Sequence, residues 1–221
     1  MDTIYLKAIN KESKTFDLFW LHGMGVDGAD FEELQSELQQ YAGIENANLI
    51  LPTAPERKIT MFNKEMPAWF DLNTDIQDDD FAEDIAGMNE SVRYVQEIIE
   101  ERHEKYPENQ IVIGGFSQGA VIALLAGYTL TEKIDAIICL SGFIPRHSRL
   151  DEISDIARKI PVFIGHGSLD SVVPALTIEE GCERLSAIKA SYELHTYPMG
   201  HEISPEEVKD LGEFLKIHLT R

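Results

Sequence analysis

Short apolar runs alternate with longer amphipathic runs along most of the chain. Runs such as "FDLFWLHG" and "QIVIGG" have the length of buried strands, whereas "DIAGMNESVRYVQEIIEERHEKY" places its apolar residues at the spacing of a helix. Strands that alternate with helices in this way are typical of βαβ units and of a mostly parallel sheet. The sequence therefore predicts an α/β fold, with helices on both faces of a central parallel sheet.

The same pattern predicts where the individual elements lie. The expected strands span residues 16–23, 47–52, 110–115, 134–142, 160–167 and 191–198. The expected helices span residues 27–41, 84–106, 117–130, 175–189 and 205–219. No repeat or linker interrupts this order, so residues 1–221 are expected to form a single domain.

One long segment, residues 52–81, has no clear period and far exceeds the usual connection of about 4 to 6 residues. It is too apolar for disorder, so we expect it to fold back over the edge of the sheet, where it either binds substrate or only covers a satellite core. Its large apolar side chains are Met61, Phe62, Met66, Trp69 and Phe70. The acidic run Asp78–Asp80 is expected to be a solvated turn, because nothing nearby completes an oxygen cage for a cation.

Charge and cysteine content narrow the range of partners and compartments. The net charge of −20 repels nucleic acid phosphates and anionic headgroups, so we expect no nucleic acid partner and no stable membrane insertion. Cys139 and Cys182 have neither the density of a disulfide framework nor metal-ligand spacing. Without a basic and apolar leader or an apolar run of membrane-spanning length, the expected location is cytoplasmic.

A Gly-x-Ser-x-Gly pattern interrupts the apolar run over residues 111–128. Ser117 lies between Gly115 and Gly119, where an expected strand ends and an expected helix begins. This is the context of a nucleophile elbow, in which the glycines let a strained turn pass close to its neighbours, and the start of the helix favours developing negative charge. The alternative is that Ser117 only caps the helix and the glycines only serve packing.

A serine nucleophile needs a base, and His201 is the best placed of the seven histidines. It follows the last expected strand and precedes the closing helix, where a loop can bring it over the edge of the sheet. His22 and His166 also end strands, but each belongs to a His-Gly turn. The histidines expected to be structural or exposed are His103, His147, His195 and His218.

Asp170, which comes just after an expected strand, is the candidate acid that would orient the base. The chain order Ser117, Asp170, His201 is the order found in α/β-hydrolases. An oxyanion hole needs the N–H of the residue after the nucleophile, here Gln118, and an N–H from the turn after an early strand. In "LHGMGVDG" the expected second donor is the N–H of Met24.

The chain resembles the acyl-protein thioesterase and carboxylesterase family of small α/β-hydrolases, also described as phospholipase/carboxylesterases. The matching stretches, in the family's order, are "WLHGMGVDGADF", "LPTAPERKIT", "MPAWFD", "GFSQGA", "LSGFIP", "HGSLDSVVP" and "YPMGH". The resemblance implies Ser117 as nucleophile, with Asp170 and His201 as its partners. It also implies an oxyanion hole formed by the backbone N–H groups of Met24 and Gln118.

The resemblance further implies that the apolar residues of segment 52–81 line an acyl groove, with Phe143 and Val173 beside them. Here the chain departs from the family, because "TMFNKEMPAWFD" lacks a glycine pair and is about one residue shorter than usual. A preference for acyl length is therefore not implied. Exposed apolar loop residues and the family's tendency to associate allow a weak homodimer.

The expected activity is hydrolysis of a carboxylic ester or acyl thioester through an acyl-enzyme, without a metal ion or an organic cofactor. The expected substrate is a small ester or acyl thioester, or an acylated protein. One alternative is a lysophospholipase acting on monoacyl lipids, which the negative charge disfavours at anionic membranes. The other is a non-catalytic ligand sensor that retains the hydrolase fold.

Overall fold

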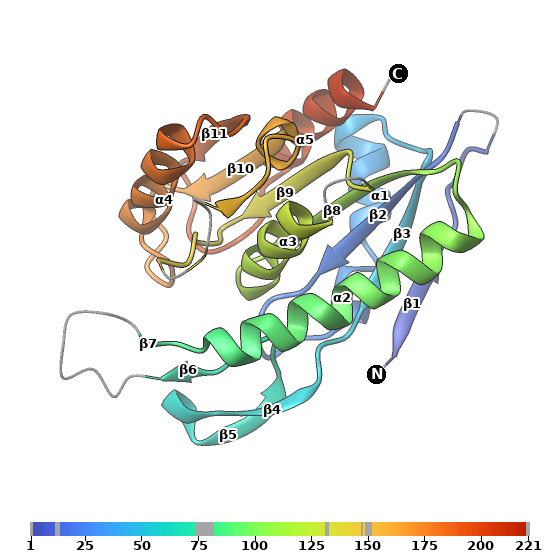
Figure 1. Ribbon diagram of the computed structural model, residues 1–221. Coiled ribbons are helices and arrows are strands. Elements are labelled where there is room, and N and C mark those ends of the chain that lie inside the picture. Colours follow the sequence, from blue (N-terminus) through green and yellow to red (C-terminus); the bar gives the residue numbers. More distant parts are fainter. Residues whose placement is uncertain are drawn as a thin grey trace.

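The computed structural model describes residues 2–11, 14–73, 82–130, 133–146, 148 and 152–219. Its centre is a seven-stranded sheet in the order β1-β3-β2-β8-β9-β10-β11 (Figure 1). These strands are β1 (Thr3–Leu6), β2 (Phe16–Leu21), β3 (Ala47–Pro52), β8 (Gln110–Phe116), β9 (Ala136–Leu140), β10 (Val162–Gly167) and β11 (Tyr192–Tyr197). Within this sheet β1 and β3 pair antiparallel, and the other neighbouring strands pair in parallel. The predicted α/β fold with a mostly parallel sheet is confirmed.

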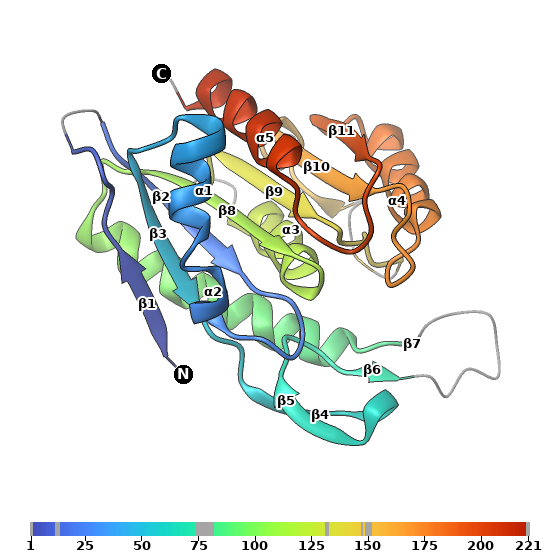
Figure 2. The ribbon, with the colours of Figure 1, turned by 180° about the vertical axis from the view of Figure 1, so that it is seen from behind.

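Helices cover both faces of the sheet, as Figures 1 and 2 show from opposite sides. One face carries α2 (Ile85–Lys105), α3 (Gln118–Thr129) and α4 (Ala175–Ala187). The other carries α1 (Leu34–Glu37) and α5 (Pro205–His218). None of the helices in the described part of the chain combines the length and hydropathy needed to cross a bilayer.

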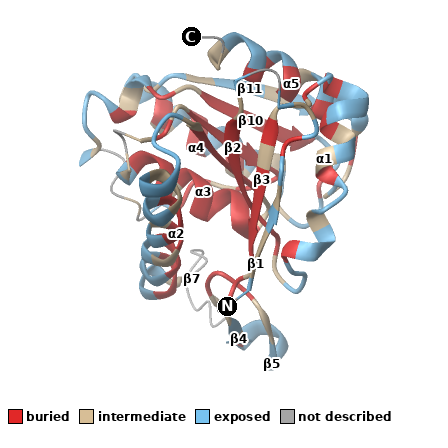
Figure 3. Ribbon diagram, turned by 90° about the vertical axis from the view of Figure 1, so that its right-hand side faces the viewer, coloured by how far each residue is buried: buried red, intermediate tan, exposed pale blue. Residues whose placement is uncertain are grey.

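The core lies between these layers, and burial follows the apolar pattern of the sequence. Figure 3 shows buried residues concentrated in the central strands and in α3, while α2 buries only one side. All six residues of β2 and all five of β9 are buried. The buried strand β8 and the buried helix α3 therefore flank the point where Ser117 lies.

The helix expected over residues 27–41 is broken into shorter pieces. A 3₁₀ turn, η1 (Gly28–Phe31), precedes α1, and a π-helical turn, η2 (Leu38–Ala42), follows it. Gly28 explains part of this, because a Cβ at this position would lie 2.6 Å from the carbonyl oxygen of Leu51. The close packing of η1 on β3 takes precedence over a continuous helix.

Segment 52–81 contains a hairpin that the sequence did not predict. β4 (Glu56–Ile59) pairs antiparallel with β5 (Lys64–Pro67), and the 3₁₀ turn η3 (Thr60–Phe62) joins them. Charged residues lie on both faces of these strands, so no apolar alternation marks them. β1 was also missed, since it is a half-buried edge strand of only four residues. Asp78–Asp80 lie outside the described residues.

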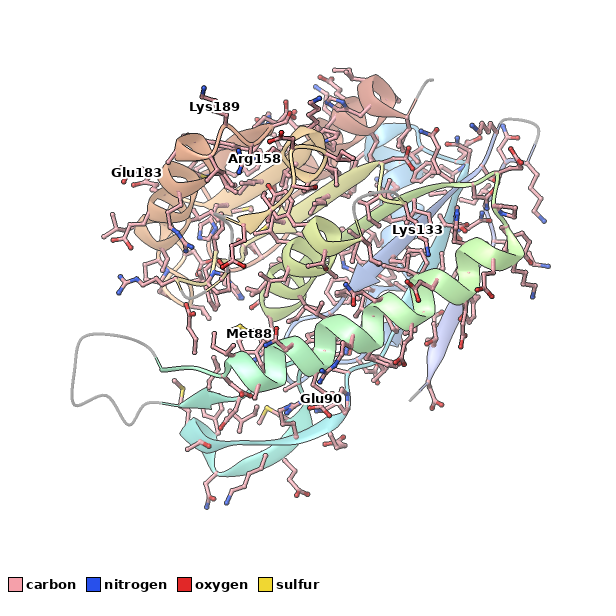
Figure 4. All side chains as sticks on the ribbon, in the orientation of Figure 1. Met88, Glu90, Lys133, Arg158, Glu183 and Lys189 are labelled. Atoms are coloured by element: carbon pink, nitrogen blue, oxygen red, sulfur yellow. The ribbon has the colours of Figure 1, made fainter. Side chains whose placement is uncertain are left out.

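Hydrogen bonds fix this hairpin to the start of α2. Asp71 accepts hydrogen bonds from the N–H and the hydroxyl of Thr60, at 2.7 and 2.5 Å, and its own N–H donates to Asp84. A second short ladder, β6 (Leu72–Asn73) with β7 (Ala82–Glu83), continues towards α2. Glu90 of α2, labelled in Figure 4, forms an ion pair with Arg57 of the hairpin at 3.0 Å.

Candidate active site

Ser117 lies on the sharp turn between β8 and α3. Its φ of 56° and ψ of −121° fall in a region that residues with a Cβ rarely adopt, so the turn stores strain. The Ser117 N–H donates to the carbonyl oxygen of Leu140 at 2.9 Å. Only glycine fits on the inside of the turn, because a Cβ on Gly119 would lie 2.1 Å from the carbonyl oxygen of Leu21. The turn holds the half-buried serine at the carboxyl edge of the sheet.

His201 lies beside Ser117, although it comes from the loop between β11 and α5. Its Nε2 is 2.9 Å from the Ser117 Oγ. The ring of Phe116 packs against the imidazole, with the ring centroids 4.7 Å apart. The loop is fixed from the other side, because the Leu169 N–H donates to the carbonyl oxygen of Met199 at 3.0 Å. The imidazole therefore has little freedom to leave the serine.

Asp170 completes a continuous chain of hydrogen bonds. Its Oδ2 lies 2.7 Å from the Nδ1 of His201, and its Oδ1 accepts from the N–H groups of Val172 and Val173 at 2.8 Å each. Burial alone would raise the pKa of Asp170, but the hydrogen bonds from His201, Val173 and Val172 outweigh it and lower the pKa. An ionised Asp170 can only accept, so Nδ1 of His201 carries the proton and Nε2 faces the serine as an acceptor.

Two backbone N–H groups indicate an oxyanion site next to Ser117. In the described part of the chain, neither the Met24 N–H nor the Gln118 N–H donates a hydrogen bond within the protein. The turn that carries Met24 touches the serine, since a Cβ on Gly23 would lie 3.5 Å from the Ser117 Cβ. Free N–H groups at this place suit a negatively charged oxygen.

His22 supports this turn in a single tautomer. The N–H of Ala54 donates to its Nε2 at 2.9 Å, so the proton is on Nδ1, which donates to the carbonyl oxygen of Gly23 at 2.6 Å. Burial lowers the pKa of His22, and the ring is therefore neutral at physiological pH. His22 acts as a fixed brace rather than a base.

The side chain of Gln118 is a feature that the sequence analysis missed. Its Oε1 accepts from the backbone N–H of Trp69 at 3.0 Å, and its Nε2 donates to the carbonyl oxygen of Phe70 at 2.8 Å. The indole N–H of Trp69 in turn donates to the carbonyl oxygen of His22 at 2.8 Å. A glutamine inside an apolar helix must find partners when it is buried, and that was the available signal.

Residues 7–219 match the family model described as Phospholipase/Carboxylesterase. The chain belongs to this family. Acyl-protein thioesterase 1 of Saccharomyces cerevisiae is 36% identical over 216 residues, which cover 92% of each chain. Acyl-protein thioesterase 1 of Mycosarcoma maydis is 30% identical over 232 residues, which cover 98% of this chain and 96% of the relative. Among solved structures, Zea mays acyl-protein thioesterase 2 has a TM-score of 0.83 at 25% identity and 99% coverage of each chain.

The residues of segment 52–81 that were expected to line a groove differ from one another in burial. Met61 and Phe62 are exposed at the hairpin turn, with 36% and 53% of their surface accessible. Met66 is half-buried beside the Gly25 turn, since its Sδ would lie 3.5 Å from a Cβ there. Trp69 and Phe70 are buried in the core at 0% and 1% exposure. The side chains of Trp69 and Phe70 therefore support the site from within the core.

Phe143 and Val173, the other two expected groove residues, are half-buried. The ring of Phe143 meets the ring of Phe70 edge-on, with the centroids 6.2 Å apart. Val173 is held by its N–H bond to Asp170. Three exposed apolar side chains occupy the same region as Val173, namely Leu169, Val172 and Leu176. Exposed apolar side chains therefore adjoin the carboxylate of Asp170.

A cavity of about 280 Å³ adjoins His201, and none of the exposed apolar residues named above is among its lining residues. Among the described residues, its lining contains the rings of Phe31 and Phe116 but no lysine or arginine. Its carboxylates are Asp30, Glu33, Glu37 and Glu202. Burial, together with the charge of Glu33, raises the pKa of Glu37. The field in this cavity is negative and opposes the entry of anionic groups.

The two cysteines do not compete with Ser117 as nucleophiles. Both are free thiols in buried positions. Burial raises the pKa of Cys139 to about 12 and that of Cys182 to about 11, so neither forms the reactive thiolate at neutral pH. Within the described residues, no group of three or more His, Cys, Asp or Glu side chains is arranged to hold a metal ion.

Proposed function

We propose that this protein is a serine hydrolase that cleaves carboxylic esters or acyl thioesters through a covalent acyl-enzyme. The observation that carries the proposal is the unbroken hydrogen-bonded chain from Ser117 through His201 to Asp170. This arrangement converts a weak serine hydroxyl into a nucleophile by supplying a base that is held in the required tautomer. The names of the relatives, acyl-protein thioesterases, support a thioester or an acylated protein as substrate.

Acylation follows from the geometry. His201 Nε2 accepts the proton of Ser117 as the Oγ attacks the substrate carbonyl carbon. The carbonyl oxygen becomes negative and is bound by the N–H groups of Met24 and Gln118. When the tetrahedral intermediate collapses, the C–O or C–S bond breaks and the imidazolium gives its proton to the leaving alcohol or thiol. Asp170 stabilises the positive imidazolium through the 2.7 Å contact.

Deacylation repeats these steps with water in place of the serine. His201 accepts a proton from water, the resulting hydroxide attacks the ester of Ser117, and the same N–H groups bind the second oxyanion. Collapse breaks the bond between the acyl carbon and Oγ, and the serine takes its proton back from His201. The products are the free acid and the intact enzyme.

The surroundings of the site favour an apolar acyl group. Leu169, Val172 and Leu176 are each more than half exposed beside the Asp170 loop. Exposed apolar side chains gathered near a reactive centre are typical of a surface that binds an apolar ligand. The buried, unpaired cysteines also support the expected cytoplasmic location.

A substrate panel tests this function. Turnover of p-nitrophenyl esters, acyl thioesters of matched chain length and lysophosphatidylcholine would be measured for the wild type and for Ser117→Ala. We expect multiple turnovers of the esters and thioesters by the wild type and a loss of about 10⁴-fold or more in the variant. A variant with wild-type turnover would overturn the proposal. Activity confined to lysophosphatidylcholine would instead assign a lysophospholipase, and binding without turnover would assign a sensor.

A further inference from the structure

A carboxyl group is buried without a partner in the first turn of α5. Glu207 has 0% of its surface exposed, and neither carboxyl oxygen forms a hydrogen bond with any described residue. An ionised carboxylate is strongly disfavoured in such a place, whereas a neutral carboxylic acid is tolerated. Burial raises the pKa of Glu207 to about 8, and the nearby Ser204 backbone offsets only part of this shift.

The Glu207 carboxyl lies directly against the backbone of β10. A Cβ added to Gly165 would lie 2.1 Å from the Glu207 Oε1, so the carboxyl occupies the space that a side chain would fill there. The side chain of Leu140 borders the same space, 3.0 Å from the added Cβ. Glu207 thus takes the place of a missing side chain and fits α5 onto the sheet.

This contact joins the two loops that carry the polar partners of Ser117. Gly165 is in β10, whose end leads into the loop of Asp170. Glu207 is in α5, whose start follows the loop of His201, and its N–H donates to the capping hydroxyl of Ser204 at 3.2 Å. The Glu207 contact therefore lies where the strand before the Asp170 loop meets the helix after the His201 loop.

We propose that Glu207 is a positioning residue for His201. In its neutral form, the Glu207 side chain packs the first turn of α5 against β10. The proposal rests on the proposed function, in which His201 is the base. When Glu207 ionises, a negative charge appears in a fully buried place where the Ser204 backbone offsets only part of the cost, and water or an outward shift of the helix must stabilise that charge. Either response moves His201 away from its 2.9 Å contact with Ser117 and lowers the rate.

The other titratable groups around this contact must be distinguished from Glu207 as the group that titrates near pH 8. The Cys139 thiol of β9 and the Tyr197 hydroxyl of β11 feel its charge, but burial raises the pKa of both, and both are neutral at pH 8. His195 of β11 lies 3.7 Å from Asp210 of α5, which also accepts a hydrogen bond from Tyr197. The turn η2, which packs on α5, carries no acidic or basic side chain.

The opposite face of β10 contributes a further histidine. Gly165 faces Glu207, so the next residue in the strand, His166, faces the other side of the sheet. There its Nε2 lies 2.8 Å from the carbonyl oxygen of Val173 and 3.7 Å from the carboxylate of Asp170. A change at Glu207 is thereby separable from a change at His166, because the sheet lies between them.

The pH profile of kcat/KM tests the proposal. An uncharged ester would be used from pH 6 to 10, with the Ser117→Ala rate subtracted, for the wild type, Glu207→Gln and Glu206→Gln, in which the exposed neighbour on the same turn is changed. We expect the wild type and Glu206→Gln to lose about tenfold between pH 7 and pH 9. Glu207→Gln should lose less than twofold. An equal loss in all three proteins, or no loss in the wild type, would overturn the proposal.

A second measurement keeps the test valid if Glu207→Gln does not fold or if no turnover is found. In wild-type protein with ¹³C-labelled glutamate carboxyls, one carboxyl signal should titrate near pH 8, and the His201 ring signals should shift with the same midpoint. If every glutamate titrates below pH 6, or if the His201 signals do not follow, the proposal fails. Absence of Ser117-dependent turnover at every pH would refute the proposed function but would leave this titration informative.

Discussion

The Nε2 of His201 lies 2.9 Å from the Oγ of Ser117, although 84 positions separate the two residues in the chain. Different parts of the sheet bring them together: Ser117 follows β8, and His201 follows β11 at the edge of the sheet. Because the carboxyl ends of parallel strands meet at one edge, loops that are distant in sequence converge there. The site depends on this convergence.

Replacing Asp170 with asparagine should reduce kcat by about 10⁴-fold with little change in KM. The amide oxygen of the new side chain would keep the N–H bonds from Val172 and Val173, so its NH₂ group would face His201. The imidazole would then accept at Nδ1 and hold its proton at Nε2, where it cannot take the serine proton. Steady-state kinetics with circular dichroism check this, and Asp210→Asn is the control. Activity in Asp170→Asn within tenfold of the wild type would contradict the role of Asp170.

Replacing Gln118 with leucine should destabilise the protein by about 2 to 4 kcal/mol. The backbone N–H at position 118 remains, but the N–H of Trp69 and the carbonyl oxygen of Phe70 lose their buried partner. Urea unfolding measures the change. Gln96→Leu, which removes a solvent-exposed hydrogen bond to Thr129, should cost less than about 0.5 kcal/mol. Equal stability of the two variants would contradict the support assigned to Gln118.

The carboxylates beside His201 should disfavour anionic substrates. For one acyl chain, kcat/KM should be roughly tenfold lower for the negatively charged coenzyme A thioester than for a neutral thioester at low salt. The difference should shrink at high salt, since screening weakens the field. Glu33→Gln should narrow it, whereas Glu97→Gln on the opposite face of the sheet should not. A salt-independent ratio would show that charge does not govern this preference.

The free energy of unfolding should depend on pH because of Glu207. Its folded pKa, about 8, is above its ordinary value of 4.5, so the unfolded chain releases the proton first as the pH rises. Its contribution to stability is therefore fully present below pH 4.5 and is lost between pH 4.5 and 8, by roughly 1.4 kcal/mol per pH unit. Subtracting the profile of Glu207→Gln from that of the wild type isolates this slope, and a flat difference would contradict it.

The sequence predicted the sheet and the chain order of the site because both follow from local patterns. Apolar runs mark buried strands, and the passage from β8 through Ser117 into α3 combines a strand, glycines and an apolar helix in one stretch. His201 and Asp170 were found because each follows a strand. Chemistry at the carboxyl edge of a parallel sheet is therefore visible in sequence.

Other features depend on packing between distant segments and left no local mark. Trp69 and Phe70 are as apolar as groove residues but are buried in the core. The hairpin of β4 and β5 carries charges on both faces, so its period is hidden. Glu207 follows a capping serine in a polar stretch that looks exposed, and only the missing side chain of Gly165 allows its burial.

Mass spectrometry of the trapped acyl-enzyme tests directly whether Ser117 is the nucleophile. The protein would be mixed with a short acyl thioester, quenched in acid within milliseconds and digested. If Ser117 is the nucleophile, one acyl group should be added to the peptide that contains Ser117, accumulating in the wild type and absent from Ser117→Ala. An acyl group on any other residue, or turnover without an adduct on Ser117 when deacylation is slowed at low pH, would contradict it.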